Sequence, residues 1–397
     1  MATYEECLAA LPSFRNDLSQ QQILTPFSTT MAESLAAGAA SESGEAVAGF
    51  TDFTTQGAFA AFATPLNNVH ATGVGIRERK GEYDPSEHVI KVFVFDKTET
   101  DVIPKTYEGG KIGIDVEVMP IQIVRNPEKP SRQKVPKAKK TKDAGSAAPP
   151  PVAPQALPPQ RQRIRPIPGG VSISPLNANF VGTLGCFLLR RNIDTEEIFV
   201  LSNNHVLADV NRLPLGTLIV QPGPEIPPFL TNPADAFAAL HTFIPIQFPG
   251  GAGSAPVFNR FDAAIANVTD GSLIQRGQMF GGVHYDPSRV LNPVPGMRVV
   301  KMGRTTGFTR GMIMATNLQG TQVNYGTPQF PRIAVFRNTI RIVGDGGAPF
   351  SLPGDSGSVI LEEETGHPVA LLFAGDGVRT TACDLGSLCQ QLGAFPI

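Results

Sequence analysis

The sequence predicts a mostly β protein, in which a small α+β domain precedes a larger domain built of short strands. The chain has 40 glycines and 36 prolines among 397 residues, and this share is typical of strands joined by many turns. From about residue 69 onward, short apolar runs alternate with turn residues, a pattern typical of β-sandwiches and β-barrels.

Composition and length limit the classes of protein that the chain can represent. Hydrophobic residues make up 41% of the chain and charged residues 17%, so a sizeable core can be buried. At about 150 residues per domain, the length favours two to three domains. The sequence has no run of about 18 apolar residues, and Glu5 and Glu6 stand where a secretion signal needs basic residues. We therefore expect a cytoplasmic protein without membrane contact.

The first 124 residues contain the predicted α+β domain. Residues 1–60 are expected to be helical or poorly ordered, with a short helix over 4–11 and an Ala/Ser/Glu/Gly-rich stretch over 31–49. Residues 61–124 form the domain itself, because β-branched residues are enriched there in three partly alternating runs. These predicted strands are 72–77, 89–95 and 112–118.

Residues 125–168 differ sharply in charge from the rest of the chain. Eleven Lys and Arg residues stand here against only Glu128 and Asp143, although the whole chain has a formal net charge of −2. The Pro/Ala-rich stretch 144–159 favours extended, poorly packed conformations. We interpret the segment as a solvated linker and not as a nucleic-acid contact, because its basic residues are not interleaved with aromatic ones.

Residues 169–397 are predicted to form the larger β domain. Strands at 181–189 and 198–202 are expected to pair around a polar turn at 190–197. Strands at 297–302 and 311–316 flank 303–310, whose glycines suit a tight turn.

The functional prediction starts from Ser356, which lies between Asp355 and Gly357 and precedes the apolar run 359–361. A serine in such a turn also occurs in ordinary hairpins, so the motif alone has low specificity. A serine hydroxyl becomes a good nucleophile only when a base takes its proton. Because Gly354 has no side chain, its N–H and that of Ser356 can both point at a developing oxyanion.

A base and a carboxylate stand upstream of this serine. His205 follows the apolar run 199–201, and Asp262 begins the apolar run 263–266, 57 residues after His205 and 94 before Ser356. A histidine can take a proton near neutral pH, and a buried aspartate then fixes the imidazole tautomer. Asp235 is an alternative acid, but it lies in a Pro/Gly-rich insertion over 221–259.

The other candidate residues favour structural roles. The remaining histidines lack a comparable position at the end of a strand: His70, His88, His241, His284 and His367. No histidine pair has metal-ligand spacing, and the four cysteines form no Cys-x-x-Cys motif, so no metal site is expected.

Together these motifs resemble the chymotrypsin/trypsin-like serine proteases. The resemblance rests on residues 354–357, on a histidine after a strand, and on an aspartate between the two. More narrowly, 201–208 and 303–311 are similar to bacterial members and to the plant NARROW LEAF trypsin-like proteins. The resemblance covers about residues 169–397.

The resemblance implies a chymotrypsin-like double β-barrel and a serine endopeptidase that cleaves peptide bonds through an acyl-enzyme. It assigns the triad to His205, Asp262 and Ser356, and the oxyanion hole to Gly354 and Ser356. It implies a protein or peptide substrate, no cofactor and no nucleic-acid partner, and it leaves homo-oligomerisation open. The alternative is a catalytically silent module of the same fold that binds peptides or partner proteins.

The resemblance also implies which residues bind substrate. Phe350, six residues before the nucleophile, is expected at the base of the pocket, with Phe373 and Gly375 at its walls. An aromatic ring where trypsin-like enzymes place a carboxylate favours small or medium apolar substrate side chains. Asp376 is the alternative, since it could supply a carboxylate from another wall.

Two departures from secreted relatives concern cysteine and activation. Cys186 holds the place of one cysteine of a family disulfide, but Val206 and Leu207 hold the place of the other, so we expect a free, buried thiol. Pairing of Cys383 with Cys389 remains open. Asp355 holds the place of the aspartate that pairs with a freed N-terminal amine in secreted relatives. Because Pro166 follows Arg165, no such amine is expected. We expect an internal donor to pair with Asp355 instead.

Overall fold

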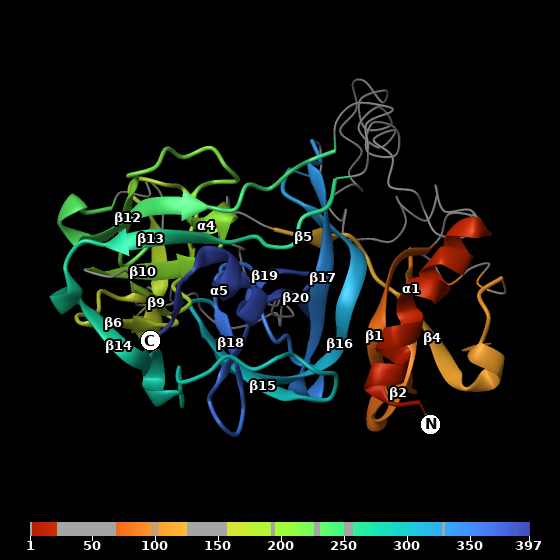
Figure 1. Ribbon diagram of the computed structural model, residues 1–397. Coiled ribbons are helices and arrows are strands. Elements are labelled where there is room, and N and C mark those ends of the chain that lie inside the picture. Colours follow the sequence, from red (N-terminus) through yellow and green to blue (C-terminus); the bar gives the residue numbers. More distant parts are fainter. Residues whose placement is uncertain are drawn as a thin grey trace, which may run out of the picture.

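The computed structural model describes residues 2–21, 69–95, 97, 100, 102–124, 157–191, 195–225, 231–249, 257–327 and 330–397. Strands predominate, as predicted, and Figure 1 shows them in three groups along the molecule. The green and yellow strands lie at one end, the blue strands in the middle, and the red and orange N-terminal elements at the other end. The predicted stretch 31–49 and linker residues 125–156 lie outside the described residues.

The first unit of the larger domain is an eight-stranded sheet. In spatial order its strands are β21 (Phe395–Pro396), β9 (Phe187–Arg191), β10 (Glu196–Ser202), β13 (Ala264–Val268), β12 (Ala236–Phe243), β11 (Leu218–Val220), β7 (Ser172–Pro175) and β8 (Gly182–Thr183). Side chains alternate across the sheet, so Val200 packs into one hydrophobic cluster and its neighbours Phe199 and Leu201 into another. The predicted hairpin of β9 and β10 is confirmed.

The second unit belongs to an eleven-stranded sheet. Six of its strands follow in the order β15 (Arg298–Gly303), β18 (Val359–Glu362), β19 (Pro368–Gly375), β20 (Arg379–Asp384), β17 (Ile333–Gly344) and β16 (Gly307–Asn324). Because β15 also pairs with β16, these six strands close on themselves. The predicted turn between β15 and β16 is shorter than expected, since only residues 304–306 separate the two strands, and Gly307 has a φ of 65°.

The N-terminal unit continues the same sheet. Beyond β16 the order runs through β1 (Val69–Arg79), β2 (Glu82–Val94), β4 (Ile112–Val118) and β3 (Thr106–Tyr107), so the three predicted strands are present. The pairing of β1 with β16 brings Gly75 opposite Ala315. A Cβ on Gly75 would lie 2.6 Å from the Met314 carbonyl oxygen, which explains a glycine within this strand. The sheet therefore joins the predicted α+β domain directly to the second unit.

Helix α1 (Tyr4–Gln20) covers one face of this N-terminal sheet and is longer than the predicted helix over 4–11. Thr3 caps it, because its hydroxyl accepts from the Glu6 N–H while the Glu6 carboxylate accepts from the Thr3 N–H. Its buried side chains, among them Leu11 and Phe14, pack on Val74 and Ile90 of the strands.

Short elements complete the described chain. They are β5 (Gln122–Ile123), the parallel pair β6 (Ile167–Gly169) and β14 (Ile274–Met279), α4 (Asn204–Leu207), α5 (Leu385–Leu392), and 3₁₀ turns at Glu108–Gly110, Pro159–Arg161, Pro233–Asp235, Gly271–Leu273, Phe280–Gly282 and Asp345–Gly347. None of the helices in the described residues is long and apolar enough to cross a bilayer. Cys186 is a free, buried thiol, as expected, and Cys383 and Cys389 are also free and buried.

Candidate active site

Adjacent strands of the first unit bring His205 and Asp262 together. Strand β10 ends at Ser202, and the single turn of α4 that follows presents His205, while Asp262 stands just before β13, which pairs with β10. His205 Nδ1 lies 2.6 Å from Asp262 Oδ2, and the His205 backbone N–H donates to Asp262 Oδ1 at 3.2 Å. Both side chains are buried. The carboxylate is therefore held against the imidazole by two contacts, as a histidine-orienting aspartate must be.

Tyr325 is a third residue of this group that the sequence analysis missed. Its hydroxyl donates to Asp262 Oδ2 at 2.8 Å, and its ring lies edge-on to His205 with centroids 6.1 Å apart. Burial and the adjacent Asp262 carboxylate raise the pKa of Tyr325 well above its ordinary value, so the phenol stays a donor. Tyr325 follows the end of β16, in the other unit of the fold, and nothing in the local sequence indicates that contact.

Ser356 lies where the two units meet. Its carbonyl accepts from the Thr183 N–H of β8 at 2.8 Å, which ties the serine loop to the first sheet. A Cβ on Gly182 would lie 2.5 Å from Val206 Cγ1 and 3.1 Å from the Ser356 carbonyl oxygen, so Gly182 lies between the segments that carry His205 and Ser356. Among the described residues, no hydrogen bond joins Ser356 Oγ to the His205 ring. In unliganded sites such bonds are often long and tighten only on substrate binding.

The loop before Ser356 presents two backbone donors. Gly354 has a φ of 100°, and the Pro353 carbonyl accepts from Thr305 Oγ1 at 2.8 Å. Because C=O and N–H point in opposite directions in a planar trans peptide, this bond fixes the direction of the Gly354 N–H. Within the described chain, the N–H groups of Gly354 and Ser356 donate to no internal acceptor. The predicted oxyanion-hole positions thus carry two unused donors.

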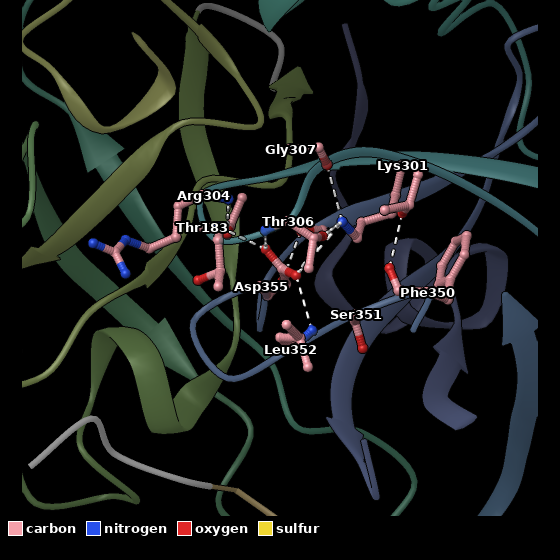
Figure 2. A network of polar contacts seen from close by, with 12 residues as sticks. Thr183, Lys301, Arg304, Thr306, Gly307, Phe350, Ser351, Leu352 and Asp355 are labelled. Atoms are coloured by element: carbon pink, nitrogen blue, oxygen red, sulfur yellow. Dashed lines mark hydrogen bonds and ion pairs between the residues drawn. The ribbon is translucent and has the colours of Figure 1, made fainter. Parts of the chain in front are cut away.

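Asp355 has a buried internal cation as partner, in agreement with the expected internal donor. Lys301 Nζ lies 3.5 Å from Asp355 Oδ2, both side chains are fully buried, and Figure 2 shows them linked through Thr306. Backbone N–H groups of Thr305 and Leu352 also donate to the Asp355 carboxylate, at 2.8 and 3.0 Å. Burial lowers the pKa of Lys301, and the attraction of Asp355 opposes that shift. This network fixes the loop on which Ser356 stands.

A cavity of about 260 Å³ opens beside Ser356. It is lined by Ile123, Ser351, Leu352, Pro353, Ser356, Leu372, Ala374, Gly375, Asp376 and Gly377. Of the residues predicted to bind substrate, the lining includes only Gly375. Phe350 is buried in the core of the second unit, where its ring centroid lies 5.9 Å from Lys301 Nζ. Phe373 points to the opposite face of β19 and packs against Phe336. Side chains alternate along β19, so Phe373 faces away from the cavity while Leu372 and Ala374 line it.

Asp376 does stand at the cavity, but Arg341 compensates its charge. Arg341 Nη2 lies 3.0 Å from Asp376 Oδ2, and the Arg379 N–H donates to Oδ1 at 2.6 Å. Burial raises the pKa of Asp376, whereas Arg341 and the backbone N–H groups of Arg379 and Val378 lower it more, so the net shift is downward. The carboxylate is therefore ionised and already paired.

The described residues contain no cluster of three or more metal-ligating side chains.

The two β units, with a His–Asp pair and a serine at their junction, define a chymotrypsin-like serine-protease fold. The model of the family described as "Nal1 C-terminal domain" matches residues 251–386, which include Asp262 and Ser356. The chain is also similar to Protein NARROW LEAF 1 of Oryza sativa subsp. japonica, with 27% identity over 241 residues. That match covers 53% of this chain, and the chain spans about two-fifths (39%) of the length of this relative.

Three solved structures of proteases are also similar to this chain. Thermobifida fusca Protease A is 17% identical with a TM-score of 0.38, and the match covers 58% of this chain and 98% of that protein. Cellulomonas bogoriensis chymotrypsin is 18% identical with the same TM-score and the same coverage. A glutamic acid specific serine protease is 18% identical with a TM-score of 0.39, and the match covers 58% of this chain and all of that protein.

Proposed function

We propose that the chain is a serine endopeptidase. The observation that carries the proposal is the buried contact of His205 Nδ1 with Asp262 Oδ2 at 2.6 Å. A neutral imidazole that donates from Nδ1 leaves Nε2 free to accept a proton, which is the tautomer that a general base needs.

In the proposed reaction Ser356 Oγ attacks the carbonyl carbon of a peptide bond while His205 Nε2 takes the hydroxyl proton. The carbonyl oxygen becomes an oxyanion that receives hydrogen bonds from the N–H groups of Gly354 and Ser356. As the C–N bond breaks, His205 returns the proton to the leaving amine, and Ser356 retains the acyl group. Water then attacks the ester with His205 again as base, which releases the acid and restores Ser356.

The cavity supports small or medium apolar substrate side chains. Its side walls are Leu352, Leu372 and Ala374, and the charge of Asp376 is balanced by Arg341. The substrate is proposed to be protein or peptide, without a cofactor. Cytoplasmic localisation stays a prediction from the sequence.

Covalent labelling tests the proposal. A fluorophosphonate probe should modify Ser356 of the wild-type protein, as located by peptide mass spectrometry, and Ser356→Ala should abolish labelling. Ser288→Ala, at an exposed serine outside the site, should keep it. Equal labelling of wild type and Ser356→Ala would contradict the proposal.

The alternative is a silent peptide-binding module of the same fold. The observation that suits it is the cavity beside Ser356, whose apolar walls can hold a peptide side chain whether or not the serine reacts. A protein that binds apolar peptides but shows neither labelling nor hydrolysis would support this alternative.

A further inference from the structure

Strand β5 brings the N-terminal part of the chain into the candidate active site. Figure 1 shows this short orange strand among the blue strands of the second unit, away from the other orange strands. It runs parallel to β16, with Ile123 opposite Asn324, and antiparallel to β19, with Ile123 opposite Gly375. Ile123 also lines the cavity beside Ser356. A residue outside the predicted protease domain is thus part of the wall.

Hydrogen bonds hold β5 firmly in this place. The Val124 N–H donates to the Asn324 carbonyl at 3.2 Å. The side chain of Gln122 is fully buried, where its amide donates to the Pro120 carbonyl at 2.8 Å and accepts from Thr381 Oγ1 at 3.3 Å. Paired on both edges and anchored by a buried amide, β5 is a built part of the site.

The position of β5 shortens the edge of β19 with which a bound peptide could pair as an added strand. Extended peptides commonly bind by adding a strand to a sheet edge. The serine loop reaches β19 at Leu372, whose carbonyl accepts from the Gly357 N–H at 3.0 Å. On the opposite edge, β20 already pairs with Leu372, Ala374 and Gly375. The remaining edge therefore begins next to Ser356 and ends at Gly375, where Ile123 already pairs.

We infer that β5 limits strand pairing of the substrate with β19 to about two residues on the amino side of the cleaved bond, the length of strand that fits between Leu372 and Gly375. Because Ile123 already pairs with Gly375, the third residue of a longer peptide turns away from β19 and adds no strand pairing. Ile123 also lines the cavity, so this chain recognises chiefly the two residues before the cleaved bond, with an apolar side chain next to it. The inference rests on the proposed function and narrows its substrate class.

Binding measurements test the inference apart from catalysis. Ser356→Ala protein would be titrated calorimetrically with N-acetylated peptides that end in a free leucine and contain one, two, three or four residues. We expect the dissociation constant to fall from one residue to two and then to change less than threefold. A further fall of tenfold or more at three or four residues would overturn the inference, and so would the lack of binding at every length.

Hydrolysis then checks the same limit on the active protein. For acyl-peptide anilides of the same lengths, kcat/KM should level off at two residues. A protein that hydrolyses none of them, while the binding series levels off at two residues, would contradict the proposed function and leave the inference standing.

Two isoleucines separate the role of Ile123 from general packing. Ile123→Ala should shift the preferred terminal side chain from leucine toward phenylalanine by at least fivefold in relative affinity. Ile121→Ala, two residues earlier and buried but not in the cavity wall, should not shift it. Equal shifts in both variants would overturn the assignment of Ile123.

Discussion

The Tyr325 hydroxyl and the His205 imidazole both contact Asp262 Oδ2, at 2.8 and 2.6 Å. Since Asp262 precedes β13 in the first unit and Tyr325 follows β16 in the second, the tyrosine fixes the carboxylate across the junction of the fold. We interpret Tyr325 as a positioning residue that acts through Asp262.

Tyr325→Phe should lower kcat about tenfold with little change in KM, because a hydrogen bond to a charged group contributes roughly 1.5–3 kcal/mol. Steady-state kinetics on a short apolar peptide measures the split between kcat and KM. Tyr285→Phe is the control, since the Tyr285 hydroxyl makes no contact with Asp262. A loss in KM alone, or equal losses in the two variants, would refute the positioning role.

The triad residues should act as a unit. Removal of Ser356 or His205 is expected to lower kcat roughly 10⁶-fold, because either loss disables the whole unit, and Asp262→Asn about 10⁴-fold, because it favours the wrong imidazole tautomer. Single-turnover and steady-state rates on one peptide measure these losses. A His205→Ala variant with near-normal turnover would rule out the assignment.

The buried Lys301–Asp355 pair should matter for stability. Lys301→Met leaves Asp355 buried without a cation, which typically costs about 3–5 kcal/mol, and we expect the lower end because backbone donors remain. Urea unfolding measures the loss, and adding Asp355→Asn should recover part of it. Lys111→Met, at the exposed pair with Glu6, is the matched control and should change little. Similar midpoints for the two lysine variants would contradict the prediction.

The cavity should prefer apolar side chains. Because Arg341 already pairs with Asp376, a substrate Arg or Lys finds no free carboxylate there, and a peptide library should be cleaved after Val, Leu or Met. A profile dominated by Arg and Lys would show that Asp376 binds substrate after all.

His70 should make the N-terminal unit sensitive to acid. It is buried against Phe95, and burial lowers its pKa to about 4 from 6.5, although the Met119 carbonyl opposes that shift. Between those values the unfolded chain binds a proton that the folded chain does not. This stability is therefore complete above about pH 6.5 and is lost as the pH falls toward 4, by up to about 3 kcal/mol.

Urea unfolding at pH 7 and pH 4.5 measures the His70 contribution. His70→Gln should reduce the pH dependence, and His284→Gln, at an exposed histidine, should not. The same acid sensitivity in His70→Gln as in wild type would assign it to other groups.

Sequence could predict the elements whose signal is local. The strands around His205 follow from apolar runs and turn residues, and Asp262 followed from its place before a buried strand. Long-range contacts left no such signal. Tyr325 reaches Asp262 from 63 residues away, and Ile123 reaches Gly375 through a pairing that no motif encodes. The prediction that Phe350 forms the base of the cavity, made from its place six residues before Ser356, was also wrong, because Ser351 and Leu352 line the cavity instead.

The pairing of β1 with β16 constrains how this protein folds. Gly75 and Ala315 are partners across a separation of 240 residues, so β1 cannot complete its sheet until most of the chain has been synthesised. A fragment of residues 169–397 would leave unpaired the part of the β16 edge that contacts β1 and β5, and an open strand edge invites association with other chains. Completion of the N-terminal sheet and of the cavity wall that β5 contributes therefore both depend on β16, which lies near the other end of the chain.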